Sequence, residues 1–238
     1  EGKLRREFLR LMRKLSKEGL FEESIKRPIP TYPELVGLVT SLEGAAVRDV
    51  IINLTRRFPG ARLVIRGVRV QGEEAAGDII AALRLFNRSF PVDVLILARG
   101  GGSLEDLQPF NTEQMVRAIR ASSIPVITGV GHEPDITLSD LAADFRASTP
   151  TGAAEAAVPS SVEVLSLLRQ REVSLAADLR KRLHGHEREL GALEKRRHFS
   201  DPSLLVNQAM QYLADEEKSL VTAADASLQS KQRWGEAH

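Results

Sequence analysis

The chain of 238 residues contains no cysteine. Disulfides, thiolate nucleophiles and cysteine-ligated zinc are therefore excluded, and a reducing compartment is compatible with the sequence. No apolar run approaches the roughly 20 residues of a membrane span, and the N-terminus carries no apolar stretch with a small-residue cleavage site. We therefore expect a soluble cytoplasmic protein without a membrane segment.

Neither sign of charge is in excess, because 33 Lys and Arg residues stand against 32 Asp and Glu residues, a formal net charge of +1. Any surface for nucleic acid must then come from local clustering of basic side chains. Aromatic residues make up only 5% of the chain, too few for an obvious platform on which bases could stack. The chain begins at Glu1 instead of a methionine, and we expect it to be part of a longer protein with further domains.

Residues 1–34 read as an N-terminal basic helix and a connector. Leu4, Phe8, Leu11 and Leu15 recur at helical spacing, with Lys and Arg on the other faces. We interpret this segment as a surface helix packed on the core, and not as a membrane or DNA helix, because solvated basic faces are common. Three prolines between residues 26 and 33 mark the connector.

Residues 35–159 alternate between strand and helix patterns. Short apolar runs at 35–40, 62–66, 93–98 and 125–130 are separated by helical patterns at 44–58, 74–87 and 111–121. Several runs are apolar on both faces, as in strands covered by helices on each side, so we predict an α/β domain with a doubly wound, mostly parallel sheet. Such sheets bind ligands beyond the carboxyl ends of their strands, which directs attention to residues 40–44, 99–106 and 131–135.

Residues 160–238 predict long helices with a narrow leucine seam, broken near Asp201 and Pro202, that form a helical hairpin or coiled coil. Gly185 and Gly191 suggest two further breaks that weaken the heptad pattern. Because such a seam has little core of its own, we expect it to pack against a partner or a second copy.

A glycine-rich loop leaves one of the apolar strands, with the sequence Arg99-Gly100-Gly101-Gly102-Ser103. Three glycines let successive N–H groups converge on an anion, and Arg99 could clamp a phosphodiester and stabilise its transition state. A plain flexible turn is about as probable for the glycines alone. The loop has no Walker lysine and no dinucleotide fingerprint, which argues against ATP or NAD.

The segment 131–135 places His132 near Asp135, and Pro134 predicts a helix that begins at Asp135. A histidine beside a carboxylate can exchange protons with water or with a leaving oxygen. The competing interpretation makes Asp135 a helix N-cap and His132 an ordinary loop residue, and the residues by themselves favour it.

Other carboxylates stand near these loops. Glu105 and Asp106 follow the glycines and are candidates for a divalent metal such as Mg²⁺, although acidic pairs in loops are more often solvated. Asp49 falls on the exposed side of the predicted helix 44–58, where Val47, Ile51, Leu54 and Phe58 form the core face, and helical periodicity gives it no special role.

Four segments in order, 40–49, 99–111, 131–135 and 146–155, resemble the catalytic domain of the exodeoxyribonuclease VII large subunit, most of all "RGGGSLEDL" followed by "GHEPD". Each motif is weak alone, and the four together are specific. The resemblance implies an exonuclease that degrades single-stranded DNA to oligonucleotides. It also implies an N-terminal OB-fold that holds DNA, and a long helical region that recruits several copies of a small subunit.

The resemblance places Asp49, Arg99, His132 and Asp135 at essential catalytic positions. We expect His132 to act as general acid or base, Asp135 to orient it, Arg99 to stabilise the phosphate and Asp49 to assist. Phosphate or DNA binding is assigned to Thr40, Ser41, Gly100, Gly101, Gly102 and Ser103. Ser41-Leu42-Glu43 departs from the family's Ser-Pro-Thr and adds a negative charge close to this site. Two alternatives remain open: a non-catalytic DNA-binding or assembly scaffold, and a metal-dependent hydrolase of a small phosphate ester.

Overall fold

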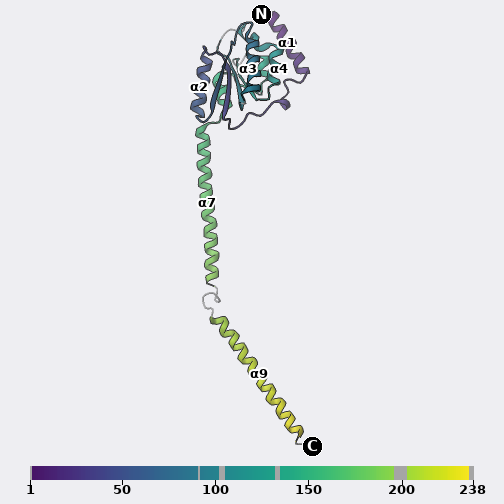
Figure 1. Cartoon of the computed structure of the whole chain (residues 1–238), viewed down its shortest axis with the longest axis vertical. Coiled ribbons are helices and arrows are strands. Elements are labelled where there is room, and N and C mark those ends of the chain that lie inside the picture. Colours follow the sequence, from purple (N-terminus) through teal and green to yellow (C-terminus); the bar gives the residue numbers. More distant parts are fainter. Residues whose placement is uncertain (1, 91, 102–104, 132–134, 196–202, 236–238) are drawn as a thin grey trace. The chain divides into compact units, whose positions relative to one another are not determined.

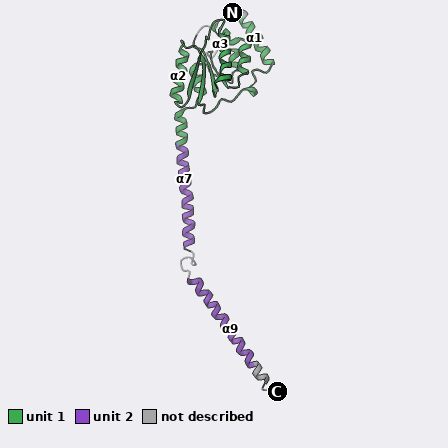
Figure 2. Ribbon diagram, in the orientation of Figure 1, with its two compact units in different colours: residues 1–168 green, residues 169–238 purple. Residues whose placement is uncertain are grey.

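The computed structural model of the chain describes residues 2–90, 92–101, 105–131, 135–195 and 203–235. They fall into two compact units, residues 1–168 and 169–238 (Figure 2). Residues 1–34 share the first unit with the sheet. Our division of the chain at residues 34 and 159 stays a prediction about its domains.

The first unit contains a five-stranded parallel sheet, which confirms the α/β prediction. The strand order is β2-β1-β3-β4-β5. The strands are β1 (Leu35–Thr40), β2 (Arg62–Gly67), β3 (Val94–Ala98), β4 (Val126–Gly129) and β5 (Phe145–Arg146). The first four lie within one residue of the predicted runs. The sequence analysis missed β5, because a strand of two residues is too short to show alternation.

Helices cover both faces of the sheet, so it is doubly wound as predicted (Figure 1). Side chains of β3 alternate between the two layers: Leu95 and Leu97 pack on one face, Val94 and Ile96 on the other. Each fully buried aliphatic side chain of this kind contributes about 1.5–3 kcal/mol. The first face carries α1 (Gly2–Lys17), α3 (Ala75–Ser89), α4 (Glu113–Arg120) and α5 (Leu138–Ala142), and the second carries α2 (Ala45–Arg57) and α6 (Pro150–Ala157).

The core face of α2 differs from the predicted one. Val47, Val50 and Leu54 are buried, whereas Ile51 is 37% exposed, so its predicted place in the core is wrong. The buried residues recur at steps of three and four, and the helix packs beside α6 on the same face of the sheet, which leaves Ile51 exposed. Asp49 is exposed, as predicted.

The N-terminal helix α1 packs on the core through Phe8, Leu11, Met12 and the fully buried Leu15, which confirms its interpretation as a surface helix. The connector that follows contains a short 3-10 helix, η1 (Glu23–Ile25). A buried ion-pair network joins this connector to the domain.

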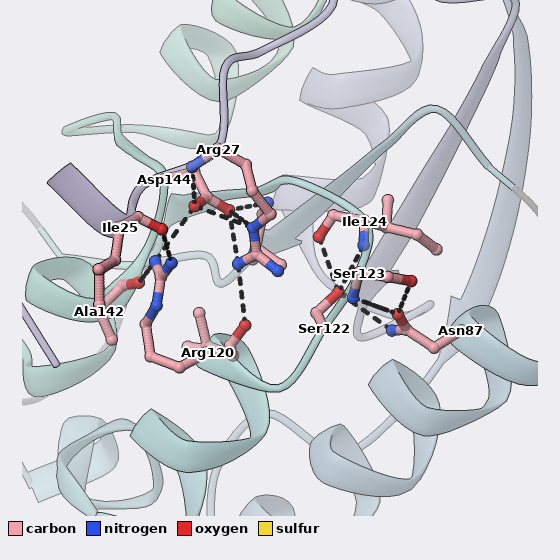
Figure 3. Close-up of polar contacts among 11 residues, drawn as sticks. Ile25, Arg27, Asn87, Arg120, Ser122, Ser123, Ile124, Ala142 and Asp144 are labelled. Atoms are coloured by element: carbon pink, nitrogen blue, oxygen red, sulfur yellow. Dashed lines mark hydrogen bonds and ion pairs between the residues drawn. The ribbon is translucent and has the colours of Figure 1, made fainter. Parts of the chain in front are cut away.

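At the centre of the network lies Asp144, whose side chain is fully buried (Figure 3). Its carboxylate accepts hydrogen bonds from the Arg27 backbone N–H at 2.8 Å and the Val126 N–H at 2.7 Å, and it pairs with the guanidinium groups of Arg27 at 2.8 Å and Arg120 at 3.1 Å. Burial raises the pKa of Asp144, but the hydrogen bonds from Arg27 and Val126 outweigh it, so the pKa lies below its ordinary value. The connector, α4, β4 and β5 are thereby fixed to one carboxylate.

A second polar cluster ties α3 to the turn before β4. Asn87 donates to Ser122 Oγ at 3.0 Å and accepts from the Ser123 backbone N–H at 2.7 Å (Figure 3). These bonds satisfy the Ser122 hydroxyl and the Ser123 N–H, which belong to the turn that connects α4 to β4.

The later part of the chain forms α7 (Ser161–Glu194) and α9 (Ser203–Gly235). Gly185 and Gly191 lie within α7, so the predicted breaks there are wrong; each glycine costs about 1 kcal/mol, which a helix of this length tolerates. The predicted break at Asp201 and Pro202 lies outside the described residues. No described side chain of α7 is buried, and pairing of the leucine seam stays a prediction. Among the residues that the structure describes, no helix combines the length and the apolar character needed to cross a membrane.

Candidate active site at the carboxyl edge of the sheet

The parallel strands place the ends of β1, β3 and β4 at one edge of the sheet. The helix after β1 covers one face, and α4, which follows β3, covers the other. The edge between β1 and β3 is therefore the topological switch point, where doubly wound sheets bind their ligands. Thr40 and Arg99 stand at this point, on neighbouring strands.

The N-terminus of α2 is open toward this edge. Its N-cap is Gly44, in an extended conformation, with no side-chain hydrogen bond to the first turn and no acidic residue in that turn. The first N–H groups of a helix lack intrahelical partners and carry the positive end of its dipole, so this terminus suits an anion.

The glycine-rich loop passes over that terminus. A methyl group at Gly100 would lie 3.8 Å from the backbone nitrogen of Ala46, in the first turn of α2. The structure thus brings together two segments that lie more than 50 residues apart in the sequence. Gly101 is exposed, whereas Gly102 and Ser103 lie outside the described residues.

Thr40 and Ser41 border the same terminus. Thr40 is only 1% exposed, and its Oγ1 has no hydrogen-bond partner in the described part of the chain. Ser41 is half-buried, and its Oγ accepts from the Glu43 backbone N–H at 3.4 Å. A buried hydroxyl without a partner costs about 1–3 kcal/mol, which a bound water or a phosphate oxygen would relieve.

Arg99 is buried, with 4% of the residue exposed. Its Nη2 lies 3.1 Å from Oδ2 of Asp106, and its backbone N–H donates to the Gly129 carbonyl at 3.1 Å. The strand end and the carboxylate together fix the direction of the guanidinium.

The candidate metal ligands are described only in part. Asp106 pairs with Arg99, whereas Glu105 begins the 3-10 helix η2 (Glu105–Asn111) and its side chain lies outside the described part. No group of three His, Cys, Asp or Glu side chains with metal-binding geometry occurs among the described residues. Asp106 is the described partner of Arg99, and the role of Glu105 and Asp106 as metal ligands stays a prediction.

Gly131, shortly after β4, lies close to Asp135. Gly131 is buried, and a methyl group there would overlap the carbonyl oxygen of Asp135, so only glycine fits. His132 lies outside the described residues, as do Glu133 and Pro134. Asp135 is half-buried, and its carboxylate makes no hydrogen bond or ion pair within the described part of the chain.

The predicted helix start at Asp135 is wrong, because α5 begins at Leu138 with Thr137 as its N-cap. Thr137 Oγ1 accepts from the Asp140 N–H at 3.1 Å, and Asp140 Oδ2 accepts from the Thr137 N–H at 2.9 Å. This reciprocal capping box satisfies two N–H groups at once, which Asp135 could not do. Asp135 is thus not a cap, and the competing interpretation of this residue is excluded.

Asp140 is a buried carboxylate close to the candidate site that the sequence analysis missed. It is 2% exposed, and its Oδ1 has no hydrogen-bond partner among the described residues. Its Oδ2 would lie 3.6 Å from a methyl group at Gly131, so a buried carboxylate stands against the start of the His132 segment. The spacing Thr137-x-x-Asp140 could have revealed the cap, but not the burial.

Asp49 lies on α2 three residues after Ala46, so the two are neighbours on the helix surface. Its exposed side chain therefore lies about one helical turn from Ala46, the residue over which the Gly100 loop passes. The structure therefore brings the segments of Asp49 and Arg99 together. The neighbouring strand β4 ends shortly before Asp135.

Fold and site together define a doubly wound α/β protein with a candidate anion site at its switch point. The family model described as "Exonuclease VII, large subunit" matches residues 20–237. The chain belongs to the exonuclease VII large subunit family.

Curated relatives agree with this assignment. An exodeoxyribonuclease 7 large subunit from Geobacter metallireducens is 45% identical over 236 residues, which cover 99% of this chain and 52% of the relative. The protein of that name from Geotalea uraniireducens is 45% identical over 95% of this chain and 50% of the relative, and the one from Hahella chejuensis is 56% identical over 68% and 37%. The chain spans about half the length of the first two of these relatives.

Proposed function

We propose that this chain supplies the catalytic part of an exodeoxyribonuclease that hydrolyses phosphodiester bonds of single-stranded DNA, as the large subunit of exodeoxyribonuclease VII. The observation that carries the proposal is the crossing of the Gly100 loop over the open N-terminus of α2, beside the buried Arg99. We expect the first N–H groups of α2, its helix dipole and the Arg99 guanidinium to act together on a phosphate at this edge of the sheet. Such a set stabilises the charge of a phosphodiester transition state.

In this proposal a phosphate oxygen lies against the first turn of α2 and the glycine loop, with the Thr40 hydroxyl as a further donor. Arg99 holds the phosphate in place and balances the charge that builds up during attack. Water attacks phosphorus, the bond to the leaving oxygen breaks, one proton leaves the water and one reaches the leaving oxygen. His132 carries out one of these proton transfers, with Asp135 orienting its ring and Asp49 assisting.

The partners follow from the family membership and from the exposed helices. We propose that α7 and α9 bind several copies of the small subunit, because Leu168, Leu175 and Leu179 of α7 and Leu213 and Leu220 of α9 are each more than half exposed. Light scattering of the chain with the small subunit tests this, with Leu175→Ser/Leu179→Ser as the variant. We expect the variant to lose the small subunit; retention at unchanged stoichiometry would contradict the role of α7.

The lack of cysteine fits action in the reducing cytoplasm.

The function is tested with the longer protein and its small subunit on end-labelled single-stranded DNA, duplex DNA and a mononucleotide ester. We expect oligonucleotides to be released from the single strand only. Binding without cleavage would support the scaffold alternative, and cleavage confined to the mononucleotide ester would support the small-phosphate hydrolase.

A further inference from the structure

The positive charge of the chain is concentrated in α1. This helix, Gly2–Lys17, contains seven Lys and Arg residues and one Glu, a net charge of +6. The whole chain carries only +1, so the remaining residues together carry −5. Solubility depends on the net charge of the protein, and it does not explain why the positive charge is concentrated in one helix.

Several of these cations make no ion pair within the part of the chain that the structure describes. Lys14 pairs with Glu113 at 2.8 Å, and Arg10 approaches Glu7 at 4.0 Å. Arg5, Arg13 and Lys17 are exposed and make no ion pair with any residue in the described ranges. The positive potential of α1 is therefore available to an external polyanion.

The basic side chains lie together on one surface. Arg6, Arg10, Arg13, Lys14 and Lys17, with the partly exposed Leu9 among them, line one shallow depression, which we call the basic face. From Arg6 to Lys17 the helix rises about 16 Å, room for a few consecutive phosphates of one strand.

Another side of α1 lies next to the element that follows the loop of Arg99. Leu4, Glu7 and Phe8 of α1 line a surface cavity together with Gln108 and Asn111 of η2, and η2 follows directly on the loop of Arg99. Asp106, the partner of Arg99, belongs to η2 as well. A strand bound at Arg99 could continue past η2 onto α1, which lies beside α4 in Figure 1.

We propose that the basic face binds the phosphates of single-stranded DNA on its way to the active site, although the sequence pattern alone did not favour α1 as a DNA-binding helix. A membrane is a poor occupant, because the apolar side of α1, with Phe8, Leu11 and Leu15, is packed into the core and cannot enter lipid. The basic face has no aromatic residue, so binding there is independent of base sequence and sensitive to salt. This inference rests on the proposed function for the identity of the strand.

The test compares two triple charge reversals in this chain. Arg10→Glu/Arg13→Glu/Lys17→Glu alters the basic face, and Arg180→Glu/Lys181→Glu/Arg182→Glu makes the same change in charge on the exposed surface of α7. The affinity for a labelled oligonucleotide is measured by fluorescence anisotropy at several salt concentrations, after circular dichroism has shown unchanged folding. Arg10→Gln/Arg13→Gln/Lys17→Gln replaces the first variant if the reversal does not fold.

We expect the α1 variant to bind at least about tenfold more weakly and to lose about 2 from the slope of log K against log salt, since each contact to a single strand contributes about 0.7. The α7 variant should keep the wild-type slope. Equal losses in both variants, or no loss in the α1 variant, would overturn the proposal, as would binding of the wild-type chain to anionic vesicles but not to DNA. Digestion is measured separately: a complete enzyme that binds DNA through α1 but does not cleave it would refute only the proposed function.

Discussion

The guanidinium of Arg99 lies 3.1 Å from the carboxylate of Asp106, and Arg99 is almost completely buried while the Asp106 side chain is 32% exposed. The pair occupies the switch point of the sheet, where the glycine loop meets α2. We expect a phosphate to bind here by sharing the guanidinium with the more exposed Asp106.

The first prediction concerns Asp106. We expect Asp106→Asn to keep most of the nuclease activity of the complete enzyme, because the amide still accepts a hydrogen bond from Arg99 and frees positive charge for the phosphate. Digestion rates of labelled DNA with and without added Mg²⁺ provide the measurement. If Asp106 were an essential metal ligand, activity would instead collapse and depend strictly on added divalent ions.

The second prediction concerns Gly131. Gly131→Ala should destabilise the first unit by about 1–3 kcal/mol and impair digestion, because the added methyl group overlaps the carbonyl oxygen of Asp135 and displaces the His132 segment. Gly77→Ala is the matched control: Gly77 is exposed in α3 with nothing near its added methyl group, so this change should stabilise the helix slightly. Urea unfolding and digestion assays of both variants provide the comparison. A Gly131→Ala protein of wild-type stability and activity would show that Gly131 is not as close to Asp135 as described.

The third prediction concerns Asp144. Asp144→Asn removes the anion between Arg27 and Arg120 and should cost about 3–5 kcal/mol at neutral pH, as expected when a buried ion pair loses one partner. Asp78→Asn, at the solvent-exposed pair with Arg69, should change stability little.

The pH dependence of this effect has a defined sign. The folded-state pKa of Asp144 lies below its ordinary value, so its stabilisation is fully present above the unfolded pKa of about 3.9 and is lost as pH falls through the folded pKa. Urea unfolding between pH 7 and pH 3 should therefore show the difference between wild type and Asp144→Asn shrinking below about pH 4. A difference that is constant across this range would mean that the charge of Asp144 contributes nothing to stability.

Periodicity predicted the four longer strands and the doubly wound sheet because their side chains pack on both faces, and that packing leaves a pattern along the chain. The pattern could not reveal β5, which is too short, or Ile51, whose exposure depends on how α2 packs beside α6. The start of α5 was placed three residues early, because Pro134 is a general helix signal whereas the box of Thr137 and Asp140 is a specific one.

The candidate site was found partly from local chemistry and partly from resemblance. The glycine loop and Arg99 follow a strand in the sequence, so their position at the carboxyl edge was predictable. That Arg99 is buried against Asp106, and that Asp140 is a buried carboxylate beside Gly131, depends on contacts between segments and left no local signal. Asp49 was singled out by the resemblance alone, and only the contact of Gly100 with Ala46 gives it a structural place near the site.

The central claim is that Arg99 and His132 carry the hydrolysis of single-stranded DNA, and it is tested most directly by digestion with the complete enzyme. Arg99→Ala should lower the rate by about 10²–10³ and His132→Ala by about 10²–10⁴, with subunit composition unchanged. Arg99→Lys keeps the charge and covers the case in which the alanine variant does not fold, and Arg84→Ala, at an exposed position on α3, should digest at the wild-type rate. Near-normal digestion by Arg99→Ala and His132→Ala would contradict the account and move the chemistry away from this edge of the sheet.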